Sequence, residues 1–168
     1  YKKIDALVIL GDRFEAAACA LAARLLSIPI LHIGGGDVTE GGCVDDDLRD
    51  VISRLSAWHA VSSAQSAERL KAIGIPPERI SQTGSLVVDN LRQTPLIPKA
   101  DLCQQLDLDP DKPILLFTQH PIPAEGPVTV AHFRQSLHAL SQLPVQVVAT
   151  YPNMDGFDAD LKAVIAES

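Results

Sequence analysis

Short apolar runs alternate along the chain with longer segments of helical spacing. Residues 6–10, Ala-Leu-Val-Ile-Leu, form a continuous apolar run that ends at Gly11, a pattern typical of a strand buried on both faces of a parallel sheet. Residues 14–26 are rich in Ala and Leu and predict a helix. Residues 28–33 predict the next strand, so the chain opens with a strand-helix-strand unit.

The alternation continues beyond a glycine-rich segment at residues 34–42. Apolar residues recur at helical spacing over 48–55, behind three acidic residues at 45–47, and indicate an amphipathic helix that begins near those carboxylates. A strand at 59–62, a helix at 64–73 that ends at Gly74, and a strand at 80–83 follow.

A change of composition separates this region from a second set of elements. Residues 93–113 contain Pro95, Pro98, Pro110 and Pro113 and one short predicted helix at 100–106. Strands at 114–118 and 145–150 and helices at 130–143 and 158–166 come after it. We therefore predict an α/β fold with Rossmann-like parallel sheets: residues 1–93 as the C-terminal part of one domain, 94–112 as a junction, and 113–168 as the N-terminal part of a second.

Composition narrows the class of protein. The 168 residues are 46% hydrophobic and carry a net charge of -7, which argues against a disordered chain and against a nucleic-acid-binding surface. No apolar run approaches the roughly 18 residues of a membrane span. The three cysteines, at 19, 43 and 103, contain no Cys-x-x-Cys pair and signal neither a zinc site nor a disulfide framework. We expect a cytoplasmic protein without nucleic-acid or membrane partners.

The polar clusters of the chain follow the predicted strands. Because ligands of parallel α/β folds bind outside the carboxyl ends of the strands, these clusters predict a ligand cleft. They lie at residues 11–15, 32–40, 62–63, 119–120 and 151–153.

The first cluster, at residues 11–15, combines a tight turn, a carboxylate and a guanidinium at the start of a helix. Arg13 and the helix N-terminus suit a diphosphate, while Asp12 could act as an acid, a base or a hydroxyl acceptor. In the alternative interpretation Asp12 caps the helix and Arg13 pairs with Glu15 or solvent. The residues alone favour neither interpretation.

Two further features allow several interpretations. The acidic residues 45–47 could bind a metal, act as an acid/base pair or stabilise a helix N-terminus, and Arg49 could pair with Asp45 or Asp46 within that helix. The glycines at 34–36 permit close backbone approach to a ligand. No G-x-G-x-x-G motif, P-loop or G-x-S-x-G motif is present, so the sequence indicates no dinucleotide cofactor and no covalent hydrolysis.

Two polar residues mark strand ends in the second half. His120, two residues beyond the strand at 114–118, could transfer a proton at neutral pH or bind a phosphate, or could be an ordinary loop histidine. Asn153 could bind a uridine or phosphate group, although Pro-Asn is also a common turn pair. His32 ends a buried strand and is consistent with a satisfied interior group.

Several separated motifs, in one order, resemble the hydrolysing UDP-N-acetylglucosamine 2-epimerases. They cover nearly the whole chain and consist of Leu-Gly-Asp-Arg-Phe-Glu at 10–15, Leu-His-Ile-x-Gly-Gly-Asp-Val-Thr-Glu-Gly at 31–41, Asp-Asp-x-Leu-Arg at 45–49, Gln-His-Pro at 119–121 and Tyr-Pro-Asn at 151–153. The resemblance implies a glycosyltransferase B type fold of two Rossmann-like domains, incomplete here at both ends.

The resemblance also implies a reaction and a set of site residues. UDP is eliminated from the substrate to give a glycal-like intermediate, and water then attacks to release N-acetylmannosamine, with neither cofactor nor metal. The implied catalytic residues are Asp12, Asp46 and His120. The implied substrate-binding residues are Arg13, Glu15, Asp37, Glu40, Arg49 and Asn153. We also expect a homo-oligomer.

The chain departs at two positions from the family that it resembles. Glu or His often stands in that family at the position of Gly34, and His at the position of Asp50 after Arg49. Three functions stay open: an epimerase acting on UDP-N-acetylglucosamine or on a modified UDP-acetamido sugar of nonulosonic-acid synthesis, a non-catalytic or regulatory UDP-sugar-binding relative, and a glycosyltransferase of the same fold.

Overall fold

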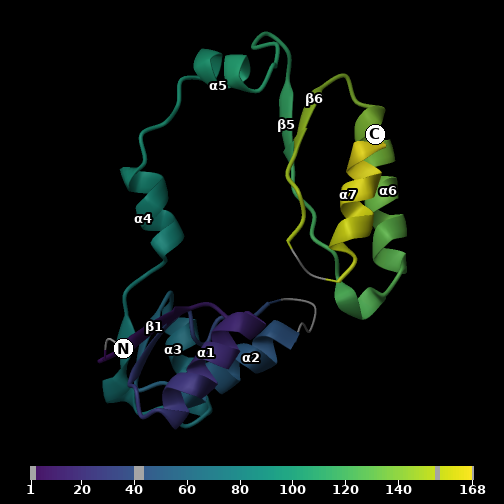
Figure 1. The fold of residues 1–168 in the computed structure, drawn as a ribbon. Helices are drawn as coiled ribbons and strands as arrows, with labels where there is room; N and C mark the ends of the chain where they lie inside the picture. Colours follow the sequence, from purple (N-terminus) through teal and green to yellow (C-terminus); the bar gives the residue numbers. More distant parts are fainter. Residues whose placement is uncertain (1–2, 40–43, 154–155, 168) are drawn as a thin grey trace. The chain divides into compact units, whose positions relative to one another are not determined.

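The computed structural model describes residues 3–39, 44–153 and 156–167. The chain forms two compact units, Tyr1–Pro95 and Leu96–Ser168 (Figure 1). Strands and helices alternate in each unit and every strand pair is parallel, which confirms the predicted α/β class. Within the described ranges, each helix is too short or too polar to cross a bilayer.

The first unit contains one four-stranded parallel sheet of order β1-β2-β3-β4. Its strands are β1 (Leu7–Leu10), β2 (Ile30–Ile33), β3 (Trp58–Val61) and β4 (Ile80–Gln82), and its helices are α1 (Phe14–Leu25), α2 (Val44–Leu55), α3 (Ala64–Ala72), the 3-10 turn η1 (Pro77–Arg79) and α4 (Leu86–Gln93). Ile9 pairs with His32, and His32 with His59. This register places the residues that follow β1, β2 and β3 at one edge of the sheet.

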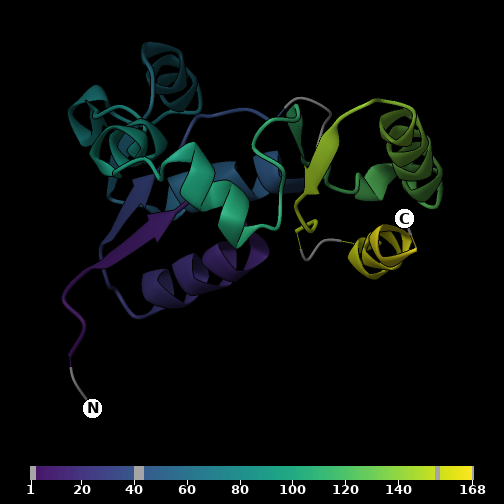
Figure 2. The same ribbon diagram turned by 90° about the horizontal axis from the view of Figure 1, so that it is seen from above.

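Helices α1 and α2 pack together and contribute to the core of the first unit. Ile9, Ile30, Ala20, Ala23 and Ile52 form this buried core, and Figure 2 shows α1 running alongside β1.

The prediction that residues 6–10 are buried on both faces is wrong. Val8 and Leu10 are 60% and 65% exposed, whereas Ile9 between them is 5% exposed. Successive strand residues point to opposite faces, and in β1 only the face of Ile9 is covered. A continuous apolar run does not reveal this, since it has the same pattern whether one face or both are covered.

The helix α4 was not predicted from the sequence. Ser85 caps it by accepting a hydrogen bond from the backbone N–H of Val87 at 3.3 Å. The helix is only eight residues long, includes two adjacent valines and buries none of its residues. Its apolar residues lie mainly on one side, but eight residues form only about two turns, which is a short stretch in which to recognise that pattern.

The second unit contains the parallel pair β5 (Ile114–Phe117) and β6 (Gln146–Ala149). Its helices are α5 (Lys99–Gln105), η2 (Pro123–Glu125), α6 (Val128–Ser141) and α7 (Asp158–Ala166), of which α6 and α7 lie side by side (Figure 1). Phe133, Leu161 and Val164 form the buried core. The hydroxyls of Thr118 and Thr150 lie 2.9 Å apart, so the residues that follow β5 and β6 also come together.

Candidate functional site

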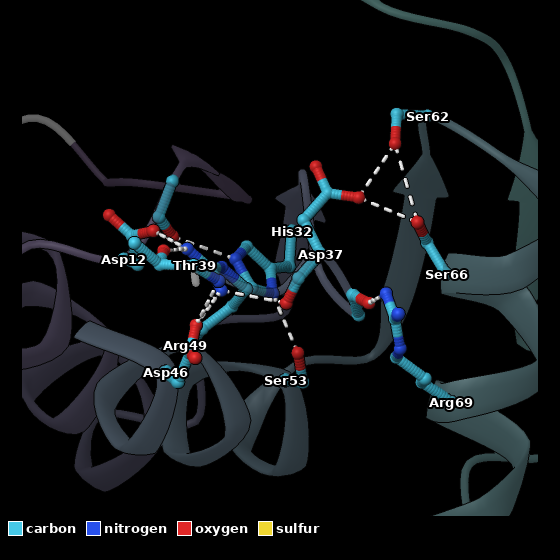
Figure 3. Close-up of polar contacts among 12 residues, drawn as sticks. Asp12, His32, Asp37, Thr39, Asp46, Arg49, Ser53, Ser62, Ser66 and Arg69 are labelled. Carbon is cyan, nitrogen blue, oxygen red and sulfur yellow. Dashed lines mark hydrogen bonds and ion pairs between the residues drawn. The ribbon is translucent and has the colours of Figure 1, made fainter. Parts of the chain in front are cut away.

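A buried guanidinium joins three segments at the carboxyl edge of the first sheet (Figure 3). Arg49, on α2, is only 5% exposed. Its Nη2 donates to Oδ2 of Asp12, which follows β1, and to Oγ1 of Thr39 at 3.1 Å. Its Nη1 donates to Oδ1 of Asp46, one turn earlier on α2, and to the backbone carbonyl of Asp37 at 2.7 Å.

These contacts decide between the interpretations given above for Asp12, as a helix cap or a site carboxylate, and for Arg49, as part of an ion pair within its helix. Asp12 does not cap α1, because the N-cap residue of that helix is Arg13 and no side chain makes a cap bond there. The carboxylate of Asp12 is instead paired with Arg49. The expected ion pair of Arg49 with Asp46 within the helix is present. The same guanidinium also pairs with Asp12, so it links the two carboxylates. Burial alone would lower the pKa of Arg49, but the hydrogen bonds that it donates to Asp12 and Asp46, with the charges of these carboxylates, outweigh burial and raise that pKa.

The side chain of Asp37 is held by serines of the next strand and helix. Its Oδ1 accepts hydrogen bonds from the hydroxyls of Ser62 and Ser66, both at 2.6 Å. The hydroxyl of Ser63 lies 2.7 Å from that of Ser66 and accepts a bond from its backbone N–H, which caps α3. Asp37 is therefore fixed at both ends, by Arg49 at its carbonyl and by serines at its carboxylate.

His32 supports the turn that carries Asp12. Its Nε2 lies 2.9 Å from the carbonyl oxygen of Gly11 and its Nδ1 lies 3.0 Å from Oγ of Ser53. A carbonyl only accepts, so Nε2 bears the proton and Nδ1 accepts from Ser53. Burial lowers the pKa of His32 more than the Gly11 carbonyl raises it, which keeps the ring neutral. His32 is thus a satisfied interior group that fixes the backbone next to Asp12.

A pocket of about 240 Å³ opens beside this network. Its polar lining includes Asp12, Asp37, Arg49 and Ser62, and its apolar lining comes from the ends of β1 and β2 and the start of α4. Gly34 also lines it with φ +84°, and a Cβ there would lie 4.0 Å from Oδ2 of Asp37. The pocket wall thus has room for a side chain at Gly34, but the backbone conformation favours glycine.

Three other site residues were predicted in the first unit, Arg13, Glu15 and Glu40. Arg13 and Glu15 form an ion pair of 3.5 Å, with side chains 38% and 58% exposed. This is the pairing that the alternative interpretation of Arg13 expected. Glu40, like Cys43, lies outside the described residues.

In the second unit the structure brings together the two predicted polar residues. The backbone N–H of Asn153 donates to Nδ1 of His120 at 3.1 Å, across the carboxyl ends of β5 and β6. A neutral His120 therefore carries its proton on Nε2, and both residues are exposed. They form one polar edge that can meet an anionic or hydroxyl-rich ligand.

Comparison with known proteins assigns the family. The sequence profile described as UDP-N-acetylglucosamine 2-epimerase matches residues 1–168. The chain belongs to the UDP-N-acetylglucosamine 2-epimerase family. It is 34% identical over 163 residues to the UDP-N,N'-diacetylbacillosamine 2-epimerase (hydrolyzing) of Legionella pneumophila, and 33% identical over 154 residues to the GDP/UDP-N,N'-diacetylbacillosamine 2-epimerase (hydrolyzing) of Campylobacter jejuni.

The chain corresponds to part of these epimerases. The matches cover 97% and 91% of this chain but only 43% and 40% of the two relatives. The crystal structure of the Neisseria meningitidis UDP-GlcNAc 2-epimerase, bound to UDP-GlcNAc, superposes with a TM-score of 0.74 at 22% identity, over 97% of this chain and 46% of that one. The fold is therefore that of the epimerase family, as the sequence motifs imply.

Several residues of the site were not identified from the sequence of this family member. Ser53 and Ser66 contact His32 and Asp37. Thr39, which contacts Arg49, and Ser62 were included only as parts of polar clusters after strands. The spacing Ser63-x-x-Ser66 at the start of a predicted helix was the available signal for a cap, but nothing in it indicates a contact with Asp37.

Metal binding was one interpretation of the acidic residues at 45–47. Among the described residues, no group of three or more His, Cys, Asp and Glu side chains could hold a metal ion. The carboxylates of Asp12 and Asp46 are instead directed to one guanidinium.

A second histidine, His59, is buried in the same sheet, and we expect it to make stability depend on pH. His59 is 1% exposed, neither ring nitrogen has a hydrogen-bond partner among the described residues, and burial, with smaller effects of His32 and Arg79, lowers its pKa to about 4. The unfolded chain therefore binds a proton below about pH 6.5 that the folded chain does not bind until about pH 4. We expect the free energy of unfolding to fall by up to roughly 3 kcal/mol between these pH values and to be insensitive to His59 above them.

Urea denaturation at pH 7, 6, 5 and 4 measures this dependence. His59→Asn should reduce the slope, with a remainder from His32, while His138→Gln, an exposed control on α6, should leave it unchanged. An unchanged slope in His59→Asn would show that His59 is not the titrating group.

Proposed function

We propose that the protein to which these residues belong is a hydrolysing 2-epimerase, which converts a UDP-acetamido sugar into UDP and the free sugar inverted at C2. The observation that carries this proposal is the pair of carboxylates, Asp12 and Asp46, on one buried guanidinium beside a pocket at the carboxyl edge of a parallel sheet. Membership of the epimerase family supports the same chemistry.

The reaction requires a base and a leaving-group site. A carboxylate removes the proton from C2 of the sugar, the C–H electrons form the C1=C2 double bond, and the C1–O bond breaks so that UDP leaves with its electrons. Water then adds its oxygen to C1 while C2 takes a proton on the opposite face. We assign Asp12 and Asp46 to the sugar, because Asp12 lines the pocket and both carboxylates accept from the one guanidinium of Arg49.

The departing diphosphate needs positive charge or hydrogen-bond donors. We assign this role to Arg13, His120 and Asn153, with His120 as the proton donor. Arg13 is the N-cap residue of α1, where backbone N–H groups and the helix dipole favour an anion. His120 and Asn153 are held together by their hydrogen bond.

The names of the relatives support a range of substrates. The Legionella and Campylobacter proteins are named for UDP-N,N'-diacetylbacillosamine or its GDP analogue, and the Neisseria structure for UDP-GlcNAc. We propose UDP-N-acetylglucosamine or a diacetylated UDP-sugar as substrate for this protein, with N-acetylmannosamine or its analogue as product.

The test uses the full-length protein in D₂O with each UDP-sugar in turn. We expect release of UDP and a free sugar that carries one deuterium at C2, because the proton on that carbon is exchanged during epimerisation. Release without deuterium at C2 would contradict the elimination. Transfer of sugar only in the presence of an acceptor would identify a glycosyltransferase.

A non-catalytic UDP-sugar-binding protein is the second candidate, and Gly34 favours it. Gly34 leaves its part of the pocket wall without an ionisable side chain, where the resemblance to the family implies one. UDP binding without any UDP release from either sugar would support this candidate over the enzyme.

A further inference from the structure

Three arginines surround a pocket at the opposite edge of the first sheet. The pocket has a volume of about 270 Å³ and lies where β2, β3 and β4 begin, whereas the site with Asp12 lies where the strands end. Arg24 comes from the last turn of α1, Arg54 from the last turn of α2, and Arg79 from η1.

The charges of this pocket are unbalanced. The residues that line it include three arginines and no Asp or Glu, although the whole chain has a net charge of -7. Among the described residues, none of the three arginines is paired with an acidic side chain. Arg24 and Arg54 also complement the dipoles of their helices, but that role does not account for Arg79 or for convergence on one pocket.

We propose that this pocket, with Arg24, Arg54 and Arg79, binds a small polyphosphate group, with a diphosphate as its minimal ligand. Guanidinium forks bind phosphate oxygens in pairs, and three of them match an anion with several charged oxygens. A volume of about 270 Å³ accommodates on the order of nine water-sized groups, which is the number of heavy atoms in a diphosphate. The hydroxyl of Ser27, in the lining between α1 and β2, is available as a neutral donor.

This site is distinct from the proposed UDP site and does not depend on it. A diphosphate there would relieve the repulsion among the three arginines, and the exposure of these side chains makes binding sensitive to salt.

The test is calorimetric titration of the full chain with inorganic pyrophosphate at low ionic strength. We expect saturable binding that Arg24→Gln, Arg54→Gln and Arg79→Gln each weaken about tenfold or more. Arg92→Gln, an exposed arginine of α4, should leave the affinity unchanged. The titration is repeated in the Arg13→Gln background, where binding at the pocket should persist and the three pocket substitutions should still weaken it, which separates this pocket from a phosphate site at the other edge.

Three results would overturn the proposal. They are the absence of saturable binding, equal weakening by Arg92→Gln, and loss of binding in Arg13→Gln with retention in the three pocket variants. Citrate and inorganic phosphate serve as comparison ligands: weaker binding of both supports a diphosphate, and equal binding of citrate contradicts it. Circular dichroism and a thermal melt of each variant confirm that a lost signal is not a lost fold.

Discussion

Asp12→Asn is expected to lower the turnover number for UDP release by about 100-fold or more, the loss typical of removing a general base. The substitution keeps the size of the side chain and an oxygen that can still accept from Arg49, so the bridge to α2 survives in part. What it removes is the negative charge and the basicity that proton abstraction at C2 requires. UDP affinity should stay near that of the unmodified protein, because the proposed diphosphate contacts involve other residues.

The matched control for Asp12→Asn is Asp47→Asn. Asp47 lies in the first turn of α2 beside Asp46, but its side chain is exposed and no ion pair among the described residues uses it. Steady-state kinetics of both variants, with UDP binding measured by calorimetry, should show loss of turnover only in Asp12→Asn. Equal turnover in Asp12→Asn and the unmodified protein would remove Asp12 from the mechanism.

The elements of the fold could be predicted where the sequence pattern has a single physical cause. Residues 158–166 were predicted as a helix with the same bounds as α7, and the strands at 114–118 and 145–150 differ from β5 and β6 by one residue at one or both ends. Parallel pairing then explains why polar clusters that are distant in sequence share an edge. The sequence pattern does not show which face of β1 is covered, because that depends on which helices pack against the strand.

The central role of Arg49 could not be read from local spacing. An arginine three residues after an aspartate is explained completely by an ion pair within a helix, and Asp46 does form that pair. The second partner, Asp12, lies 37 residues earlier and is reached only because α2 packs against α1. The family motifs included all three residues as part of the site, but only the structure shows one guanidinium between two carboxylates.

The serines around Asp37 illustrate the same limit. Serine is common at helix starts and strand ends, so Ser63 and Ser66 are explained by capping α3. The contact of Ser66 with Asp37 spans 29 residues and requires the glycine-rich turn after β2 to approach the first turn of α3. Gly36, in that turn, has a backbone conformation and a close neighbour that make it the most demanding position of the site.

Gly36→Ala is expected to destabilise the first unit by about 2–5 kcal/mol, because two costs add at one position. Its φ of +77° lies in the left-handed region, which costs an alanine about 1–2 kcal/mol. A Cβ there would also lie 2.2 Å from the backbone oxygen of Ser66, so the turn or the helix has to move, and overpacking typically costs about 1–3 kcal/mol. Urea denaturation measures the free energy of unfolding directly.

Gly74→Ala separates these two costs. Gly74 has φ +91° at the end of α3, but no heavy atom lies within 4 Å of the position that a Cβ would take, so alanine there incurs only the conformational cost of about 1–2 kcal/mol. Equal destabilisation by the two variants would contradict the steric argument for Gly36. The carbonyl of Gly36 also accepts from Nη1 of Arg69 at 3.1 Å. A shift large enough to accommodate the methyl group therefore draws Asp37 away from Ser62 and Ser66, and UDP-sugar turnover should decline with stability.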